Sequence, residues 1–143
     1  MIEKNIKVVF DTNVWISFLM GKRLAFIKKH ISKGQIVIVT SSILLDEIKE
    51  VTSREKLKKY FSQKSVSDLI ELLEIIAEKF EVNPTNFICR DPKDNFLLDL
   101  IEHSKADFLV TGDKDLLILD TFQMTKILSP ADFESEIDFR NGR

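Results

Sequence analysis

The amino-acid sequence predicts an α/β fold in which helices cover both faces of a mainly parallel central sheet. Short, almost continuously apolar runs alternate with longer segments whose apolar residues recur at helical spacing, as in strands joined by crossover helices. The composition, 44% hydrophobic and 31% charged with only four Gly and three Pro, is that of a folded chain. With 143 residues the chain is long enough to bury one hydrophobic core, so we expect a single domain over residues 1–143.

The first half of the chain supplies two predicted strands, at residues 6–10 and 35–39, which are short apolar runs rich in β-branched residues. Ser41 or Ser42 is suited to cap a helix that follows directly, at residues 43–51. The remaining expected segments are a helical turn at 14–19, a helix at 24–32, a basic amphipathic segment near 54–61 and a longer helix near 65–80.

The second half begins with a loop at Asn83-Pro84, and residues 87–89 are expected to form a short edge strand. Asp91-Pro92 is typical of a helix start. The expected elements from there on are a helix near 93–104, a strand at 108–111, a turn at Gly112, a short helix at 114–119, a last strand at 126–128 and a final helical turn from Pro130.

Several classes of protein are disfavoured by the composition. The single cysteine, Cys89, excludes an internal disulfide, and with His30 and His103 it is too sparse for a zinc site. A lone cysteine after an apolar pair is more typical of packing than of a nucleophile. No stretch of eighteen apolar residues and no signal peptide is visible, so we expect a cytoplasmic protein without a membrane span.

Basic residues are concentrated in the first half of the chain. The net charge of −2 hides an excess of seven positive charges over residues 1–64 and of nine negative charges over residues 65–143. Such surfaces suit a phosphate backbone, although solvated helix faces explain either group of cations equally well. The residues that could bind a phosphate backbone form two groups, one with Lys22, Arg23, Lys28 and Lys29 and one with Arg54, Lys56, Lys58 and Lys59.

Four acidic residues lie where predicted strands end or where the next helix begins. Asp11 directly follows the first strand, and Asp113 comes just after the strand that ends at Thr111. Glu47 lies in the first turns of the helix after the second strand, and Asp94 lies at the start of the helix after Pro92. In open parallel sheets the functional crevice lies outside the carboxyl ends of the strands, and we expect these side chains to converge there.

Each carboxylate alone also has a structural explanation. Asp11 and Asp94 suit helix N-termini, Asp113 suits a turn, and Glu47 suits an exposed helix face. If the four carboxylates converge, these separate structural explanations no longer suffice, because like charges a few ångströms apart raise one another's pKa unless a cation neutralises them. Mg²⁺ and Mn²⁺ prefer oxygen ligands and activate water for phosphodiester hydrolysis, so that no side-chain nucleophile is required.

Four short motifs carry a resemblance to one nuclease family. Val8-Val-Phe-Asp11-Thr-Asn13-Val resembles the first motif of PIN-domain nucleases, and Ser41-Ser-Ile-Leu-Leu-Asp-Glu47-Ile resembles the second. Arg90-Asp-Pro-Lys-Asp94-Asn and Phe108-Leu-Val-Thr111-Gly-Asp113-Lys-Asp115-Leu resemble the third and fourth. The first and fourth together are specific, whereas the second alone is weak. The resemblance covers residues 6 to about 133 and is strongest to the VapC-like branch of toxins from toxin–antitoxin systems.

The resemblance implies a PIN-like three-layer α/β/α sandwich and a metal-dependent endoribonuclease that hydrolyses RNA phosphodiester bonds. It implies that Asp11, Glu47, Asp94 and Asp113 are the catalytic and metal-binding residues, with Mg²⁺ or Mn²⁺ as the cofactor and Asp115 as an auxiliary candidate ligand. Asn13 and Thr111 are expected to hold the carboxylates by hydrogen bonds. A toxin of this branch also implies a partner antitoxin and a homodimer formed by apolar helix faces.

Three positions close to the candidate ligands affect the choice of metal-binding residues. Asp46 competes with Glu47, although the core-facing pattern of the helix and the family's register favour Glu47. Asp91 competes with Asp94 and remains a lesser candidate, since a residue before proline is typical of a turn. Asn95 stands where many relatives have a second acid, which leaves the expected site one charge poorer.

Other phosphate-handling classes fit the sequence less well. Gly21-Lys22 lacks the surrounding residues of a P-loop, and Asn13 stands where a haloacid-type phosphatase needs a second Asp. A response-regulator receiver needs an early acidic pair, whereas the only early acid besides Asp11 is Glu3, outside the predicted strand. The main rival is a PIN-fold module that binds RNA or protein without catalysis.

Overall fold

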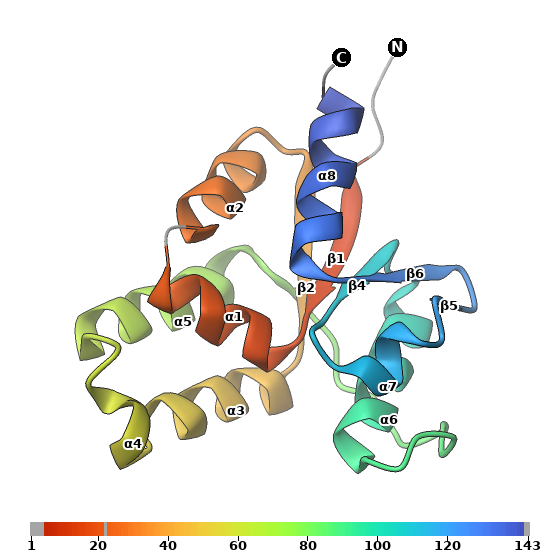
Figure 1. Cartoon of the computed structure of the whole chain (residues 1–143), viewed down its shortest axis with the longest axis horizontal. Helices are drawn as coiled ribbons and strands as arrows, with labels where there is room; N and C mark the ends of the chain where they lie inside the picture. The colour runs from red at the N-terminus through yellow and green to blue at the C-terminus, as the bar shows by residue number, and fades with distance from the viewer. Residues whose placement is uncertain (1–4, 22, 142–143) are drawn as a thin grey trace.

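The computed structural model describes residues 5–21 and 23–141 and has the predicted α/β architecture (Figure 1). The strands of the described residues form one six-stranded sheet in the order β3-β2-β1-β4-β6-β5. All neighbouring strands are parallel except β5, which pairs with β6 in antiparallel fashion. The strands are β1 (Ile6–Phe10), β2 (Ile36–Thr40), β3 (Glu78–Lys79), β4 (Phe108–Val110), β5 (Thr121–Phe122) and β6 (Thr125–Leu128).

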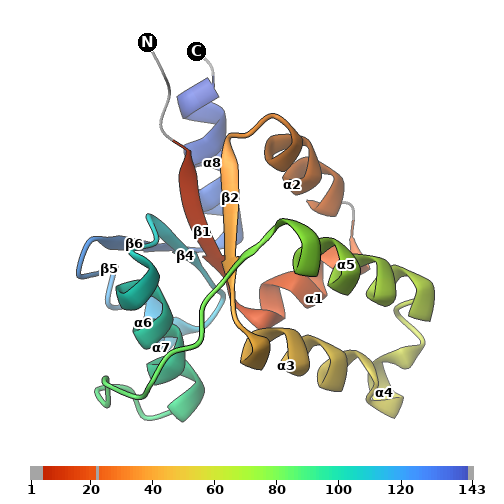
Figure 2. The same ribbon diagram turned by 180° about the vertical axis from the view of Figure 1, so that it is seen from behind.

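Helices cover both faces of this sheet, as the two opposite views show (Figures 1 and 2). One face packs against α1 (Thr12–Met20), α2 (Arg23–Ser32), α3 (Ser42–Thr52), α5 (Gln63–Ile76) and α8 (Pro130–Asn141). The other face packs against α6 (Pro92–Ser104) and α7 (Lys114–Leu117), while the short α4 (Glu55–Lys58) follows α3. The expected three-layer α/β/α sandwich is therefore confirmed.

The core follows from the alternation of side chains along β1. Val8 and Phe10 point into one helical layer and Val9 into the other, and all three are fully buried. The Phe10 ring contacts Trp15 and Phe133 edge-to-face, with ring centroids 5.0 and 5.5 Å apart. Because Phe10 is buried among aromatic rings, the backbone at the end of β1 is fixed, and with it the position of the next residue, Asp11.

Local capping explains where two of the helices begin. Ser41, rather than Ser42, caps α3, since its Oγ accepts a hydrogen bond from the Leu44 amide at 3.2 Å. Asp91 caps α6 by accepting from the Lys93 amide at 2.9 Å, ahead of Pro92 at the first helical position. Asp91 therefore has the turn role that its place before proline predicts.

One predicted strand near the sheet edge is wrong, and the predicted end of one helix is misplaced. Residues 87–89 form no strand, and Phe87 and Ile88 are exposed. The edge strand is β3, whose Glu78–Lys79 pair with the end of β2, and the predicted helix at 65–80 therefore ends at Ile76. The Phe80 amide also donates to the Thr40 carbonyl at 2.9 Å, so strand pairing replaces a helical pattern that continues in the sequence.

The connection between β3 and α6 is tied to α6 at two points. Asp99 Oδ1 accepts hydrogen bonds from the backbone and side chain of both Thr85 and Asn86, at 2.8–3.1 Å. Asn95 accepts from the Cys89 amide at 2.8 Å and donates to the Cys89 carbonyl at 3.0 Å. These contacts hold a long irregular segment against the second helical layer.

The C-terminal part of the chain is more regular than the sequence predicts. The final helical turn is a twelve-residue helix, α8, because Phe133 and Ile137 lie one turn apart and are both buried against the sheet. The two-residue β5 was not predicted, since its pairing with β6 depends on a turn in which Gln123 has a positive φ of 54°.

Candidate metal centre

The site lies at the carboxyl ends of β1 and β4, which are neighbouring parallel strands in the sheet. Asp11 directly follows β1, Asp113 lies three residues after the end of β4, and Asp94 is in the first turn of α6. The structure thus brings together three acids that are up to 102 positions apart in the sequence.

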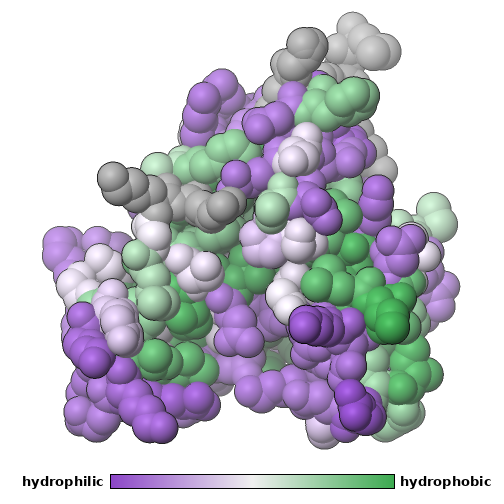
Figure 3. Space-filling view, viewed as in Figure 1, coloured by the Kyte–Doolittle hydropathy of each residue, from purple (hydrophilic) through white to green (hydrophobic). Residues whose placement is uncertain are grey.

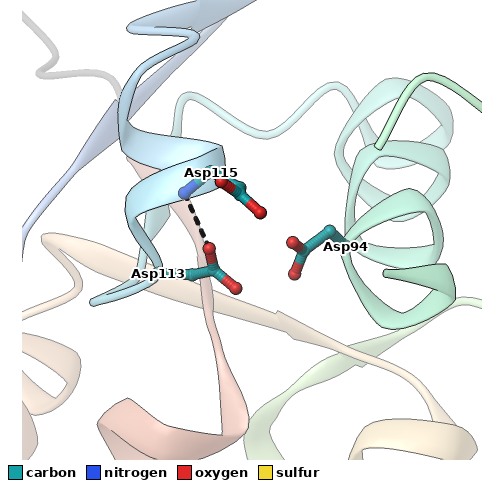
Figure 4. Close-up of side chains that lie close together, drawn as sticks. All are labelled: Asp94, Asp113 and Asp115. Atoms are coloured by element: carbon teal, nitrogen blue, oxygen red, sulfur yellow. Dashed lines mark hydrogen bonds between the residues drawn. The ribbon is translucent and has the colours of Figure 1, made fainter. Parts of the chain in front are cut away.

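Asp94, Asp113 and Asp115 form a compact group of carboxylates (Figure 4). One oxygen from each lies within 4.8 Å of the others, with Asp94 reaching across from α6 towards α7. Asp113 caps α7, since its Oδ1 accepts from the Asp115 amide at 2.8 Å. Asp113 was expected to suit a turn, and it in fact caps a short helix, which also fixes its carboxylate beside Asp94.

Asp94 has the most unfavourable surroundings for a negative charge. The residue is 3% exposed, and its Oδ2 has no hydrogen-bond partner among the described residues. Burial, followed by the charge of Asp113, raises the pKa of Asp94 from 3.8 to about 7. An unpaired carboxylate oxygen buried among other carboxylates costs free energy unless a cation or a proton neutralises it.

Asp11 is joined to this group through Thr111. The Thr111 hydroxyl donates to Asp11 Oδ2 at 2.8 Å and accepts from the Asp113 amide at 3.0 Å. Burial raises the pKa of Asp11, and the charges of Glu47 and Asp113 add to this, while the Thr111 hydrogen bond opposes it. Asp11 makes no side-chain capping bond to α1, so its carboxylate is not used to begin that helix.

Glu47 lies on the other side of Asp11, on α3. Its Oε1 accepts from the Thr12 hydroxyl at 2.5 Å, and its Oε2 forms an ion pair with Lys93 Nζ at 2.5 Å. The hydrogen bond to Glu47, together with its charge, raises the pKa of Lys93. Glu47 is not part of the group formed by Asp94, Asp113 and Asp115.

These contacts define one site with two parts, which we call the aspartate cluster (Asp94, Asp113 and Asp115) and the Glu47 pocket. The Glu47 pocket is a hollow of about 460 Å³ between α3 and the start of α6. Hydrophilic residues line the lower edge of the molecule in Figure 3, around α3 and α4 and below α7. The residues that line the hollow are Asp11, Ile43, Leu44, Asp46, Glu47, Glu50, Pro92, Lys93, Phe96 and Leu97.

The donor set fits a hard divalent cation. All candidate ligands are carboxylate oxygens, which Mg²⁺ and Mn²⁺ favour, and the sulfur of Cys89 is not among them. The unpaired Asp94 Oδ2 supplies a buried negative atom that no hydrogen bond satisfies. Asp94, Asp113 and Asp115 could therefore hold an ion, with Asp11 next to them through Thr111.

The neighbouring candidates have other surroundings. Asp46 is an exposed residue on the rim of the hollow, and Asn95 is engaged with the Cys89 backbone and does not take the place of an acid in the site. Asn13 is exposed, and within residues 5–21 and 23–141 its side chain makes no hydrogen bond to a carboxylate. Thr12, one position earlier, makes the contact that was expected of Asn13.

Three residues of the site were missed by the sequence analysis. Thr12 contacts Glu47, Lys93 pairs with Glu47, and Arg90 pairs with Asp115 at 3.0 Å. The third motif already contains Arg90 and Lys93, three positions apart on either side of Pro92. This spacing of cations around a helix start was the available signal, but which acids they would meet depends on the packing of α6 against α3 and α7.

The two basic groups lie in different places relative to the site. Lys28 and Lys29 are on α2, which leads into the start of β2 and therefore away from the carboxyl edge, while Lys22 and the side chain of Arg23 lie outside the described residues. Arg54, Lys56, Lys58 and Lys59 lie in and around α4, at the far end of α3 from Ser42. An 11-residue helix such as α3 rises about 16 Å, so about this length of helix separates the second group from the end of α3 that begins at Ser42.

Comparison with known proteins agrees with this geometry. An α/β domain with carboxylates gathered at the ends of adjacent parallel strands is compatible with a hydrolytic nuclease. The PIN domain family matches residues 7–115, from β1 into α7, and the chain belongs to this family. The comparison with curated proteins gives no match. Among the described residues, none of the helices has both the length and the apolar character that crossing a membrane requires.

Proposed function

We propose that this PIN domain is a metal-dependent endoribonuclease that hydrolyses RNA phosphodiester bonds. The observation that carries the proposal is the buried, unpaired Asp94 Oδ2 beside Asp113 and Asp115. Bound Mg²⁺ or Mn²⁺ would lower the pKa of a coordinated water and offset the negative charge of the phosphate. Asp11, Asp94 and Asp113, with Asp115 as a further ligand, would hold this ion.

The remaining residues would orient the reaction. Thr111 keeps Asp11 and the Asp113 backbone in a fixed relation, and Thr12 does the same for Glu47. Glu47, which faces the hollow from α3, would bind the ion or orient the attacking water. The cations around α4 would bind the phosphates of the RNA on either side of the cleaved bond.

A test is cleavage of a single-stranded RNA by the wild-type protein and by Asp11→Asn and Asp94→Asn. The wild type is expected to cut in Mn²⁺ or Mg²⁺ and to stop in EDTA, while both variants lose at least about a hundredfold in rate. Equal cleavage by all three proteins would indicate contamination or a different site. Isothermal titration with Mn²⁺ on the same samples reports ion binding independently of activity.

One observation favours a second candidate, a PIN-fold module that binds RNA or protein without catalysis. Glu47 and Asp115 already pair with cations of the chain itself, Lys93 and Arg90. In that case RNA would bind and remain intact with Mg²⁺, Mn²⁺ and other divalent ions. The absence of Mn²⁺ binding in the titration would decide for this candidate.

We further propose, from the motif resemblance, that the nuclease acts in the cytoplasm as the toxin of a toxin–antitoxin pair and forms a homodimer. Induced expression is expected to arrest growth, and Asp11→Asn is expected to relieve the arrest. A short neighbouring reading frame that encodes a DNA-binding protein, and whose co-expression restores growth, would identify the antitoxin. Growth arrest by Asp11→Asn as well would contradict a toxic nuclease activity.

A further inference from the structure

The segment that begins α6 sends one cation to each part of the site. Arg90 pairs with Asp115 of the aspartate cluster, and Lys93 pairs with Glu47. The two pairs differ in depth. Arg90 and Asp115 have side chains that are 87% and 46% exposed, whereas the Glu47 side chain is only 18% exposed. The Lys93–Glu47 ion pair therefore lies deeper in the site than the Arg90–Asp115 pair.

The backbone of Lys93 is fixed, whereas its side chain is largely exposed to solvent. Its amide donates to the capping carboxylate of Asp91 at 2.9 Å, which holds the residue in the first turn of α6. Its side chain is 66% exposed and reaches over the hollow to Glu47 Oε2. A four-carbon stem of this kind can turn its ammonium to another anion nearby without any change of the backbone.

The charged residues that line the hollow are mostly acidic, and one of them, Glu50, pairs with Arg54 at 2.8 Å. Of the described residues that line it, Asp11, Asp46, Glu47 and Glu50 are acidic, and Lys93 is the one cation. A polyanionic strand can enter such a hollow only when the acids are neutralised and a cation remains to meet its phosphate. Lys93 is the residue in position to do so.

A divalent ion and an ammonium cannot share Glu47 Oε2 without strong repulsion between them. We propose that Lys93 exchanges partners: it neutralises Glu47 in the ion-free protein, and when Glu47 serves the ion it turns to the substrate phosphate. This inference rests on the proposed nuclease function. It makes Lys93 both a competitor of the ion and a positioning residue for the phosphodiester.

The exchange predicts opposite effects of one substitution on two ligands. Lys93→Met keeps the length of the stem and removes the charge, so Mn²⁺ binding is expected to become about tenfold tighter. The same variant should bind RNA about tenfold more weakly, because a phosphate contact to a charged group is lost. Lys93→Arg is expected to restore RNA binding. Lys126→Met, at an exposed position in register with Phe108 at the start of β4, is the matched control and should change neither affinity.

The experiment is isothermal titration of each protein with Mn²⁺ alone, followed by titration of a short single-stranded RNA in Ca²⁺. A gel at the end of the second titration checks that the RNA is intact. Thermal unfolding in EDTA shows whether each variant is folded. If Lys93→Met is destabilised, the comparison is repeated with Lys93→Gln, which retains a polar partner for Glu47.

Each outcome of the two titrations tests either the proposed exchange of partners or the proposed nuclease function. Tighter Mn²⁺ binding with weaker RNA binding supports the exchange. Unchanged Mn²⁺ affinity, or a loss of affinity for both ligands, overturns it and leaves Lys93 as a structural partner of Glu47. A wild-type protein that does not bind Mn²⁺ at all overturns the proposed nuclease function instead, so the two failures are distinguishable.

Discussion

The hydroxyl of Thr111 donates to Asp11 Oδ2 at 2.8 Å and thereby joins the ends of two neighbouring strands, β1 and β4. The same oxygen accepts from the Asp113 amide at 3.0 Å. One fully buried side chain thus sets the spacing between Asp11 and the aspartate cluster. The backbone of Thr111 is held in turn by the Leu128 carbonyl at the end of β6, at 2.9 Å.

Thr111→Val removes this hydroxyl at nearly constant volume. Asp11 then loses the hydrogen bond that favours its charged form, and the Asp113 amide loses its acceptor. We expect Mn²⁺ affinity to fall about 10- to 100-fold and the free energy of unfolding to fall by about 1–3 kcal/mol. Titration calorimetry and urea unfolding measure the two effects. Thr111→Ser keeps the hydroxyl and should stay close to the wild type in affinity.

Asp94→Asn tests the electrostatic cost of burying the Asp94 carboxylate. The folded protein raises the pKa of Asp94 from 3.8 to about 7, so it binds a proton more tightly than the unfolded chain does. The wild type therefore loses stability relative to the variant as the pH rises from about 4 to about 7. In EDTA at pH 8 we expect the variant to melt about 5 °C higher, with no difference near pH 4. Saturating Mn²⁺ should reverse the order at pH 8, and a variant that melts lower in EDTA at every pH would contradict this account.

Asn95→Asp tests whether a second acid in the third motif would extend the site. The Asn95 amide donates to the Cys89 carbonyl, and a carboxylate there would repel that oxygen. We expect the substitution to lower the free energy of unfolding by about 1–3 kcal/mol without tightening Mn²⁺ binding. Chemical unfolding and Mn²⁺ titration check both statements. A gain in Mn²⁺ affinity would mean that the carboxylate can reach the aspartate cluster after all.

The position of the two basic groups predicts which one binds RNA. Lys56→Ala together with Lys59→Ala removes exposed cations near α4, at the end of α3. RNA affinity should fall, and the slope of log affinity against log salt should become shallower by about 0.7 for each lost phosphate contact. Lys28→Ala with Lys29→Ala, on α2, is the matched pair and is expected to leave RNA binding unchanged. Fluorescence anisotropy at several salt concentrations measures both, and equal effects would contradict a path along α3.

The sequence predicted the strands that carry the site because their apolar runs are buried on both faces of the sheet. Asp11 and Asp113 follow such runs, so their approach at one edge could be expected from parallel topology alone. Glu47 was chosen over Asp46 by helix pattern and family register. Asp91 was ranked below Asp94 because a residue before proline is typical of a turn, and the structure gives Asp91 a capping role. The roles of these residues in catalysis remain proposals.

Other features depend on contacts that no local pattern contains. The helical periodicity of α5 continues past Ile76, yet pairing with β2 turns residues 78–79 into a strand. The pairing of Lys93 with Glu47 depends on how α6 packs beside α3, which the sequence does not specify. The motif resemblance named Asn13 as a residue that holds a carboxylate, whereas in the structure the hydroxyl of Thr12 donates to Glu47.

The two anchors of the β3–α6 connection have a practical consequence for engineering this domain. Asp99 fixes residues 85 and 86, Asn95 fixes Cys89, and Phe87 and Ile88 lie between them with exposed side chains. Extra residues inserted after Phe87 would lengthen a stretch whose two ends are already secured. A peptide tag or a fluorescent reporter placed there would leave both chain termini free. It would also leave α6, the helix that carries Asp94, in its position.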